Sequence, residues 1–206
     1  MPSSALSHVI AFDDFPFSRA HRGDVPVVGA IFAGLRLEGV VRGRVRRDGA
    51  NATRNLAELV ERSKFAPQLQ LVMLQGIALG GFNVVDIAAL HARLSLPVLV
   101  VARRAPRLDK IRRALLTRVP GGARKWSLIE RAGPMEPSNG LWIQRAGLSA
   151  ARAAATIALH ARHGVLPEPL RAAHLIASAL EVRRPYGQAA DARSRPAASA
   201  SRPRAR

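Results

Sequence analysis

Short apolar or alternating runs, bounded by glycine, proline and acidic residues, predict β-strands along much of the chain. Three such runs open the chain and follow one another closely, so we expect them to pair as an antiparallel meander. Two later apolar runs are separated by helical segments, which is typical of parallel neighbours in a covered sheet. The predicted strands are 8–13, 25–34, 37–49, 69–74 and 97–102, with shorter ones at 126–130 and 140–144.

Apolar residues that recur every three or four positions predict helices between and after these strands. The predicted helices are 53–64, 84–94, 106–118, 148–163 and 168–182. This order of elements is the layout of ribonuclease H-like domains. We therefore expect one α/β domain of this class over residues 1–188, with a mixed sheet flanked by helices. Residues 189–206 are rich in Ala, Arg, Ser and Pro, which predicts a disordered basic tail.

The charge of the chain is strongly positive. Its net charge is +18, and all but three of the 32 basic residues are arginine. Such a balance favours a polyanionic partner, most often nucleic acid, although a biased genome also enriches alanine and arginine. The absence of cysteine excludes disulfides and thiolate metal sites. No apolar run is long enough for a membrane span and no signal peptide is evident, so we expect a cytoplasmic protein with no membrane partner.

Arginines are concentrated in two places. Three of them alternate with valines in the third predicted strand, so that their guanidinium groups line one face. Two more directly follow the apolar strand at 97–102 and open a second basic cluster. Guanidinium groups bind phosphate through paired hydrogen bonds, so we predict that both clusters hold nucleic-acid phosphates. These residues are Arg42, Arg44 and Arg46 in the first cluster and Arg103 and Arg104 in the second.

Two adjacent acids, Asp13 and Asp14, end the first strand. Adjacent residues of a regular strand point to opposite faces, so at most one of them faces a given site. An acid at the end of a central strand is a typical position for a metal ligand. A polar strand end before Pro16 is the plainer explanation.

Further acids lie at two turns. Asp48 belongs to an Asp-Gly turn whose chemistry explains it, and it is also a candidate metal ligand. If Asn83 caps the following helix, Asp86 lies at position N3 and stabilises the helix end; a ligand or base role is the alternative. The preceding glycines, Gly80 and Gly81, allow close backbone approach, and free N–H groups at the helix start are candidates to hold a phosphate.

Five segments resemble one known family. They are AFDDFPF (11–17), RDGANAT (47–53), QGIALGGFNVVDI (75–87), LPVLVVARR (96–104) and LPEPLRAAHLIASAL (166–180). Together they resemble the endonuclease dU family, which is similar in fold to the repair nuclease endonuclease V. The resemblance implies a ribonuclease H-like fold and, by analogy, metal-dependent cleavage of DNA that contains deaminated bases.

The resemblance carries over unevenly to the site residues. Asp13 matches the acid that ends the first strand of endonuclease V. Where that protein has Asp-Gly at the end of a later strand, this chain has Gln75, whose amide oxygen can bind a hard cation but brings no negative charge. Leu148 lies in the stretch that has a histidine in endonuclease V. The motif Pro-Glu-Pro-x-Arg-x-Ala-Asp is matched around Arg171, with His174 at the last acid.

These observations predict a magnesium- or manganese-dependent DNA repair endonuclease. The expected metal ligands are Asp13, Asp14, Asp48 and Gln75, the expected catalytic groups are Asp13, Asp48, Asp86 and His174, and further phosphate contacts are Gly80, Gly81 and Arg171. For His174 a hydrogen-bonded structural role is the plainer alternative.

A rival function is a nucleic-acid-binding relative with little or no catalysis, because Gln75 and Leu148 replace an acid and a proton donor. A purely structural domain is a third hypothesis. We expect DNA as the partner, with RNA still open, and a monomer or weak dimer.

Overall fold

The computed structural model describes residues 5–179, so the predicted tail at 189–206 lies outside the described residues. Seven strands form one sheet in the order β3-β2-β1-β4-β7-β9-β8. They are β1 (His8–Asp14), β2 (Asp24–Ala33), β3 (Arg36–Arg46), β4 (Leu71–Gln75), β7 (Val98–Ala102), β8 (Glu136–Ser138) and β9 (Leu141–Ala146). The strands β5 (Ala78–Leu79) and β6 (Asn83–Val84) form a small separate hairpin.

Three neighbouring strands in the middle of the sheet are parallel, and the strands on either side of them pair antiparallel. β1, β2 and β3 pair as the predicted antiparallel meander. β4 is parallel to β1, and β7 is parallel to β4. β9 returns antiparallel to β7. The carboxyl ends of β1, β4 and β7 therefore lie at the same edge of the sheet, where α/β proteins commonly place their sites.

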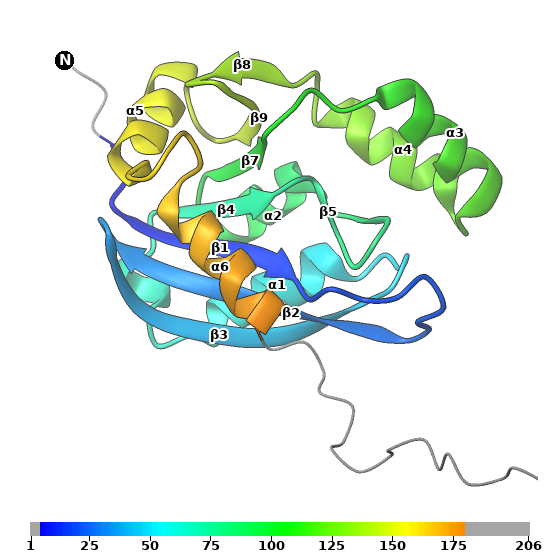
Figure 1. The fold of residues 1–206 in the computed structure, drawn as a ribbon, viewed down its shortest axis with the longest axis horizontal. Helices are drawn as coiled ribbons and strands as arrows, with labels where there is room; N and C mark the ends of the chain where they lie inside the picture. The colour runs from blue at the N-terminus through cyan, green and yellow to red at the C-terminus, as the bar shows by residue number, and fades with distance from the viewer. Residues whose placement is uncertain (1–4, 180–206) are drawn as a thin grey trace, which may run out of the picture.

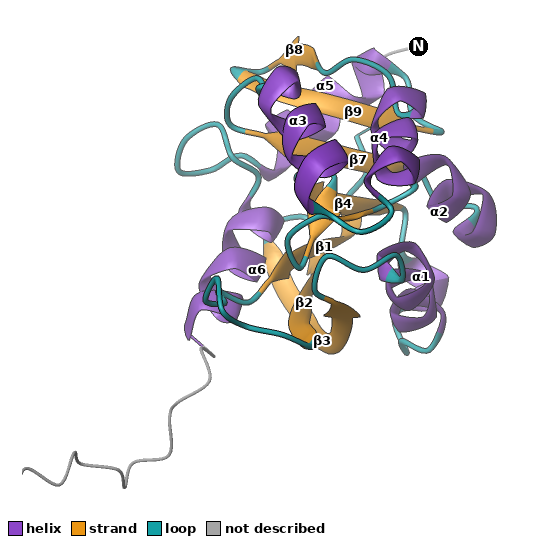
Figure 2. Ribbon diagram, turned by 90° about the vertical axis from the view of Figure 1, so that its right-hand side faces the viewer, coloured by secondary structure: helices purple, strands orange, loops and turns teal. Residues whose placement is uncertain are grey.

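Helices cover both faces of the sheet (Figure 1). The helices are α1 (Ala52–Glu61), α2 (Ile87–Leu94), α3 (Leu108–Arg118), α4 (Gly122–Arg131), α5 (Ala150–His160) and α6 (Glu168–Ala179), with a short 3-10 turn at Ala66–Gln68. Figure 2 shows α6 on one side of β1 and β2 and α1 on the other, with α3 and α4 beside each other near β7. Within residues 5–179, none of the helices is long and apolar enough to cross a membrane.

Successive side chains of each strand point to opposite faces of the sheet, so the sheet has a hydrophobic core on each face. On β1, Ile10 and Phe12 pack into the core under α1 and α2. Their neighbours Val9 and Ala11 pack into the core under α5 and α6. Because successive side chains alternate, this pattern also determines the faces of the residues that follow at the strand end.

The predicted strand at 126–130 is wrong, because this stretch belongs to α4. Lys125 and Ile129, four residues apart, are both buried, which is the spacing of one helix face. A five-residue apolar run fits either a strand or a helix by periodicity alone.

The start of α2 also differs from the prediction. The helix begins at Ile87 rather than near residue 84, because Asn83 and Val84 pair with β5. Asn83 is therefore not an N-cap. Asp86 is the N-cap itself, and its side chain accepts a hydrogen bond from the Ala89 N–H.

Candidate active site

Asp13 lies at the end of β1, on the face covered by α6, and only 6% of its surface is exposed. The Nδ1–H of His174, which α6 carries to this point, donates to Asp13 Oδ2 at 2.8 Å. The backbone N–H of Asp14 donates to Asp13 Oδ1 at 3.0 Å. Burial raises the pKa of Asp13, while the hydrogen bond from His174 opposes that rise. Half of the His174 side chain remains exposed, so the pair is accessible from solvent.

Gln75 lies beside Asp13. Phe12 and Leu74 are partners in the parallel pairing of β1 and β4, so the next residues, Asp13 and Gln75, are neighbours on one face of the sheet. The Gln75 Oε1 is buried and has no hydrogen-bond partner among residues 5–179. Buried polar atoms are normally paired, so an unpaired oxygen beside a carboxylate indicates a place for a ligand.

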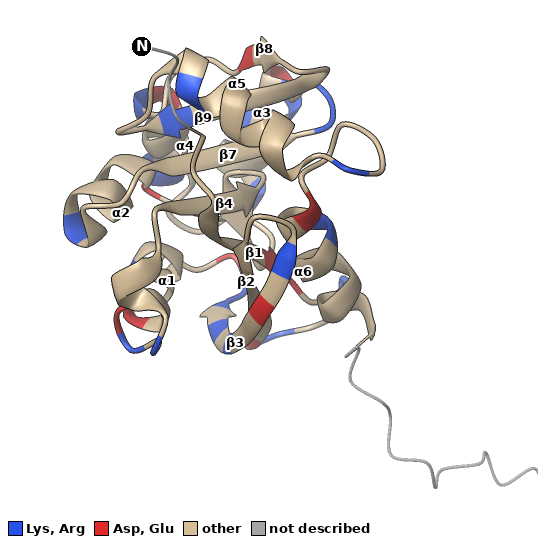
Figure 3. Cartoon of the chain, turned by 90° about the vertical axis from the view of Figure 1, so that its left-hand side faces the viewer, with Lys and Arg blue, Asp and Glu red and all other residues tan. Residues whose placement is uncertain are grey.

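The arginine row of β3 lies on the same face as Asp13. Asp13 pairs with Val28, and Val28 pairs with Arg42, so the three side chains form one line across the sheet. Two strand spacings put Arg42 roughly 10 Å from Asp13. Arg42 lies over the ring of Phe15 at 5.6 Å. Arg42, Arg44 and Arg46 are all exposed, and Figure 3 shows basic positions on β3.

Asp14 points to the opposite face, as the alternation predicts. Its Oδ2 accepts the N–H of Gly80 at 2.8 Å. On the same loop, Asp48 Oδ1 accepts the N–H of Phe82 at 2.8 Å. A Cβ at Gly81 would lie 2.5 Å from Asp48 Oδ1, so the loop passes too close for a larger residue. The glycine loop is thus held by two carboxylates, and the N–H groups of Gly80 and Phe82 are not free for a phosphate.

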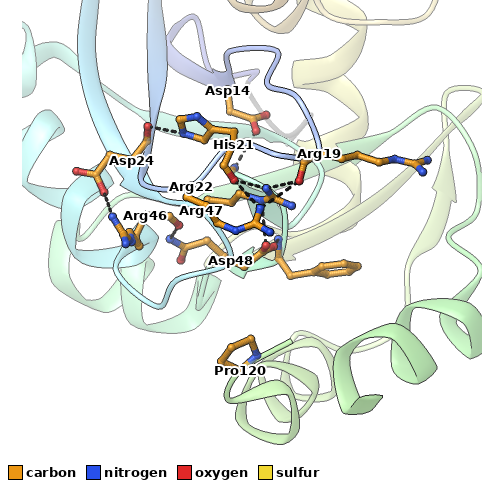
Figure 4. A network of polar contacts seen from close by, with 12 residues as sticks. Asp14, Arg19, His21, Arg22, Asp24, Arg46, Arg47, Asp48 and Pro120 are labelled. Carbon is orange, nitrogen blue, oxygen red and sulfur yellow. Dashed lines mark hydrogen bonds and ion pairs between the residues drawn. The ribbon is translucent and has the colours of Figure 1, made fainter. Parts of the chain in front are cut away.

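Asp48 is further tied to the β1–β2 loop by its neighbour (Figure 4). The Arg47 Nε donates to Asp48 Oδ2 at 3.2 Å. The same guanidinium reaches the carbonyl oxygens of Arg19 and His21. Asp48 itself has a left-handed backbone, with φ of 49°. Its turn therefore joins three loops at this edge of the sheet.

Asp86 lies apart from Asp13, at the start of a helix on the other face. Besides capping α2, its Oδ2 accepts a hydrogen bond from Arg131 at 2.9 Å. Asp86 thus stabilises the helix start, as the plainer interpretation predicts, but as the N-cap and not at N3. Capping uses Oδ1, and the ion pair with Arg131 uses Oδ2. The structure brings Asp13, Gln75 and His174 together, and it places Asp14, Asp48 and Asp86 on the opposite side of the sheet.

The structure also shows where the remaining residues singled out from the sequence lie. Leu148 is buried in the core with α5 and cannot donate a proton. The guanidinium of Arg171 is bonded to Glu168 Oε2 at 2.5 Å. Arg103 and Arg104 are exposed in the loop after β7, at the edge where Gln75 ends β4.

The donors beside Asp13 fit one divalent cation and not two. Among residues 5–179, no three Asp, Glu, His or Cys side chains converge as a metal cluster. Asp13 and the unpaired Gln75 oxygen nonetheless supply one charged and one neutral donor, and the His174 ring lies beside them. Mg²⁺ is often held by one or two carboxylates, with water and substrate phosphates completing its shell. A second ion would lack negative charge.

One protein-family model covers most of the chain. Residues 5–181 match the family model for endonuclease dU. The chain belongs to the endonuclease dU family. A UPF0215 protein from Deinococcus radiodurans is 65% identical over 172 residues, which cover 84% of this chain and 88% of that one. A UPF0215 protein from Methanothermobacter thermautotrophicus is 41% identical, over 88% and 91% of the two chains.

Solved structures confirm the ribonuclease H-like fold. A protein of unknown function from Archaeoglobus fulgidus is 33% identical, with a TM-score of 0.79 over 85% of this chain and 99% of that one. Endonuclease V from Bacillus subtilis has a TM-score of 0.55 at 10% identity, over 87% and 84%. Endonuclease V from Ciona intestinalis, in complex with DNA that contains an inosine, has a TM-score of 0.53 at 12% identity, over 84% of each chain.

The half-buried carboxyl group of Asp14 predicts a pH effect on stability. Burial raises the pKa of Asp14 from 3.8 to about 6. The folded state then binds a proton that the unfolded state has lost, so this group's contribution to stability falls as pH rises from 4 through about 6. Asp14→Asn keeps an oxygen that can accept from the Gly80 N–H. It removes the pH-dependent fall in the free energy of unfolding, which amounts to up to about 3 kcal/mol.

The test compares thermal unfolding of the native chain and Asp14→Asn from pH 4 to pH 8. The melting temperature of the variant, relative to the native chain, should rise up to about pH 6 and then level off. The exposed acid Asp24, changed to Asn, is the control and should show no such rise. A constant difference between native and Asp14→Asn at every pH would contradict the prediction.

Proposed function

We propose that this endonuclease dU family member is a divalent-cation-dependent endonuclease acting on DNA with deaminated bases. The supporting observation is the hydrogen bond between buried Asp13 and half-exposed His174, next to the unpaired oxygen of Gln75 at the carboxyl ends of parallel strands. The family description and the inosine-containing DNA bound by the Ciona protein support the choice of substrate.

In this proposal Asp13 and Gln75 hold a magnesium or manganese ion through their oxygens. When bound, such an ion polarises the phosphodiester and activates water. His174 donates Nδ1–H to Asp13, which fixes the ring and leaves Nε2 as the nitrogen that can exchange a proton with solvent or substrate. His174 thus moves a proton near the phosphate, and Asp13 orients it.

The arginines on this side would position the strand. Arg42 lies in line with Asp13 across the sheet, and the exposed Arg44 continues the row. Arg103 and Arg104 extend from the adjacent strand end. Paired hydrogen bonds from guanidinium groups suit the oxygens of a phosphodiester backbone. Arg171 is a weaker candidate, since Glu168 already binds it.

A second candidate function is nucleic-acid binding with little or no cleavage. It is favoured by the single acid at the site and by Leu148, which lies in the apolar core. One carboxylate gives a cation less Coulombic attraction than two would. In that case DNA binding should persist in chelator and weaken steeply with salt.

The test is a cleavage assay with the native chain. Labelled duplexes and single strands with uracil or hypoxanthine are incubated with Mn²⁺, with Mg²⁺ or with chelator, beside undamaged strands. We expect metal-dependent cutting of the damaged strands. Binding without any cutting would support the second function, and the absence of both would overturn the proposal.

A further inference from the structure

A groove lies on the opposite face of the sheet from Asp13. It is bounded by the start of α1, by α2 and by α4, and it encloses about 590 Å³. Figure 2 shows α1, α2 and α4 on the side away from α6, the helix that carries His174. We call it the α1–α2–α4 groove. It is separate from the candidate active site.

Basic side chains dominate this groove. Its lining includes five cations, which are Arg54, Arg93, Arg124, Lys125 and Arg131, and two acids, which are Asp48 and Asp86. The difference gives the lining a charge of +3. A groove lined mainly by one sign of charge concentrates ligands of the opposite sign.

Both acids are already bonded within the protein. Asp48 accepts hydrogen bonds from Phe82 and Arg47 through its two oxygens. Asp86 accepts from Ala89 and Arg131. Both carboxylates are thus already hydrogen-bonded within the protein. The net charge of the groove lining remains positive.

Three of the cations also have partners. Lys125 is buried and donates to the carbonyl oxygens of Asp48 and Pro120. Arg93 is bonded to Glu61 at 2.6 Å. Arg131 binds Asp86, yet 64% of its side chain is exposed.

Two arginines are left to bind a ligand. For Arg124, no ion pair is formed with any residue in 5–179. For Arg54, the only acidic oxygen within 4 Å among these residues is that of Glu58, at 3.9 Å, and 67% of the side chain is exposed. The Arg54 Nε donates to Asn55 Oδ1 at 3.4 Å, so its two terminal amino groups remain for an anion. Arg124 can present its full donor fork.

We propose that the α1–α2–α4 groove binds backbone phosphates of a nucleic-acid strand, at a distance from the cleavage site. Guanidinium groups match phosphate oxygens in geometry. Arg54 and Arg124 come from different helices and are exposed, which suits a polymer that passes along the groove. A small phosphate ligand would instead need enclosed donors around it.

This inference rests on the proposed nucleic-acid substrate and not on cleavage. Because the groove and Asp13 are on opposite faces, only a strand long enough to pass around the sheet edge can reach both. Removing Arg54 and Arg124 should therefore weaken the binding of long strands, which contact both faces. A very short strand can still bind at the Asp13 face, so its affinity should change little.

The experiment measures binding of the full chain to labelled single-stranded DNA by fluorescence anisotropy in chelator, so that no cutting occurs. The groove variant is Arg54→Gln with Arg124→Gln. The matched control is Arg62→Gln with Arg162→Gln, two exposed arginines outside the groove. Strands of about 6 and about 30 nucleotides are compared over a range of salt concentrations.

For the long strand we expect the groove variant to bind about tenfold more weakly and its salt slope to fall by about 1.4, since each lost phosphate contact contributes about 0.7. The control should change less than about threefold, with the same slope. Equal losses in both variants would overturn the proposal, as would an unchanged affinity of the groove variant for the long strand. If the native chain binds no DNA, the proposed function fails as well.

Discussion

Replacing Asp13 by asparagine should lower the rate of metal-dependent cleavage about a thousandfold or more, equivalent to roughly 4 kcal/mol of transition-state stabilisation. The change removes the carboxylate that lies beside Gln75 and alters the acceptor that orients His174. Side-chain volume is nearly preserved, so the fold should persist. The measurement is the single-turnover rate on a uracil-containing strand with Mn²⁺.

Asp14→Asn is the matched control for this prediction. It makes the same substitution one residue later, on the other face of β1, where the carboxylate bonds Gly80. We expect its cleavage rate to stay within about threefold of the native rate at pH 8. Equal losses of cleavage rate in the two variants would mean that Asp13 and Asp14 both act by stabilising the end of β1. Asp13 would then have no separate role in cleavage.

Gln75→Glu should strengthen Mn²⁺ binding at least tenfold. The substitution keeps the side-chain length and adds a second negative charge beside Asp13. Coulombic attraction at 4 Å amounts to about 1 to 4 kcal/mol between water-like and intermediate dielectric values. Without metal, two carboxylates close together on a buried face repel one another, so the melting temperature in chelator should fall. Saturating Mn²⁺ should then restore it.

Gln144→Glu is the control for this effect. Gln144 is also a buried glutamine of the same sheet, on β9, but its partner in the pairing is Val100, which belongs to the other core. Calorimetric titration should show stronger Mn²⁺ binding only in Gln75→Glu. Equal affinities in the native chain and Gln75→Glu would place the cation elsewhere.

Much of the fold could be predicted from the sequence because strand and helix periodicities are local. The meander of β1 to β3 and the parallel β4 and β7 follow from the length and spacing of apolar runs. The stretch 126–130 could not be assigned, since five residues do not distinguish the two periods. The start of α2 was misplaced because β5 and β6 pair over only two residues each.

The candidate site was predicted only in part. Alternation correctly separated Asp13 from Asp14. The position of Asp48 and Asp86 on the side opposite Asp13 depends on loop paths, which no local pattern gives. The contact between Asp13 and His174 joins residues 161 positions apart, and only the resemblance in the last helix pointed to it. The arginines of the α1–α2–α4 groove were missed, because they are single residues on separate helices.

The most direct test of the central claim is where Mn²⁺ binds. The ring signals of the six histidines can be followed by NMR during a titration with small amounts of Mn²⁺, which broadens nearby nuclei. The His174 signals, assigned with a His174→Asn variant, should broaden first in the native chain and lose this selectivity in Asp13→Asn. Broadening of another histidine first, or of all six equally, would contradict a cation site formed by Asp13 and Gln75 beside His174.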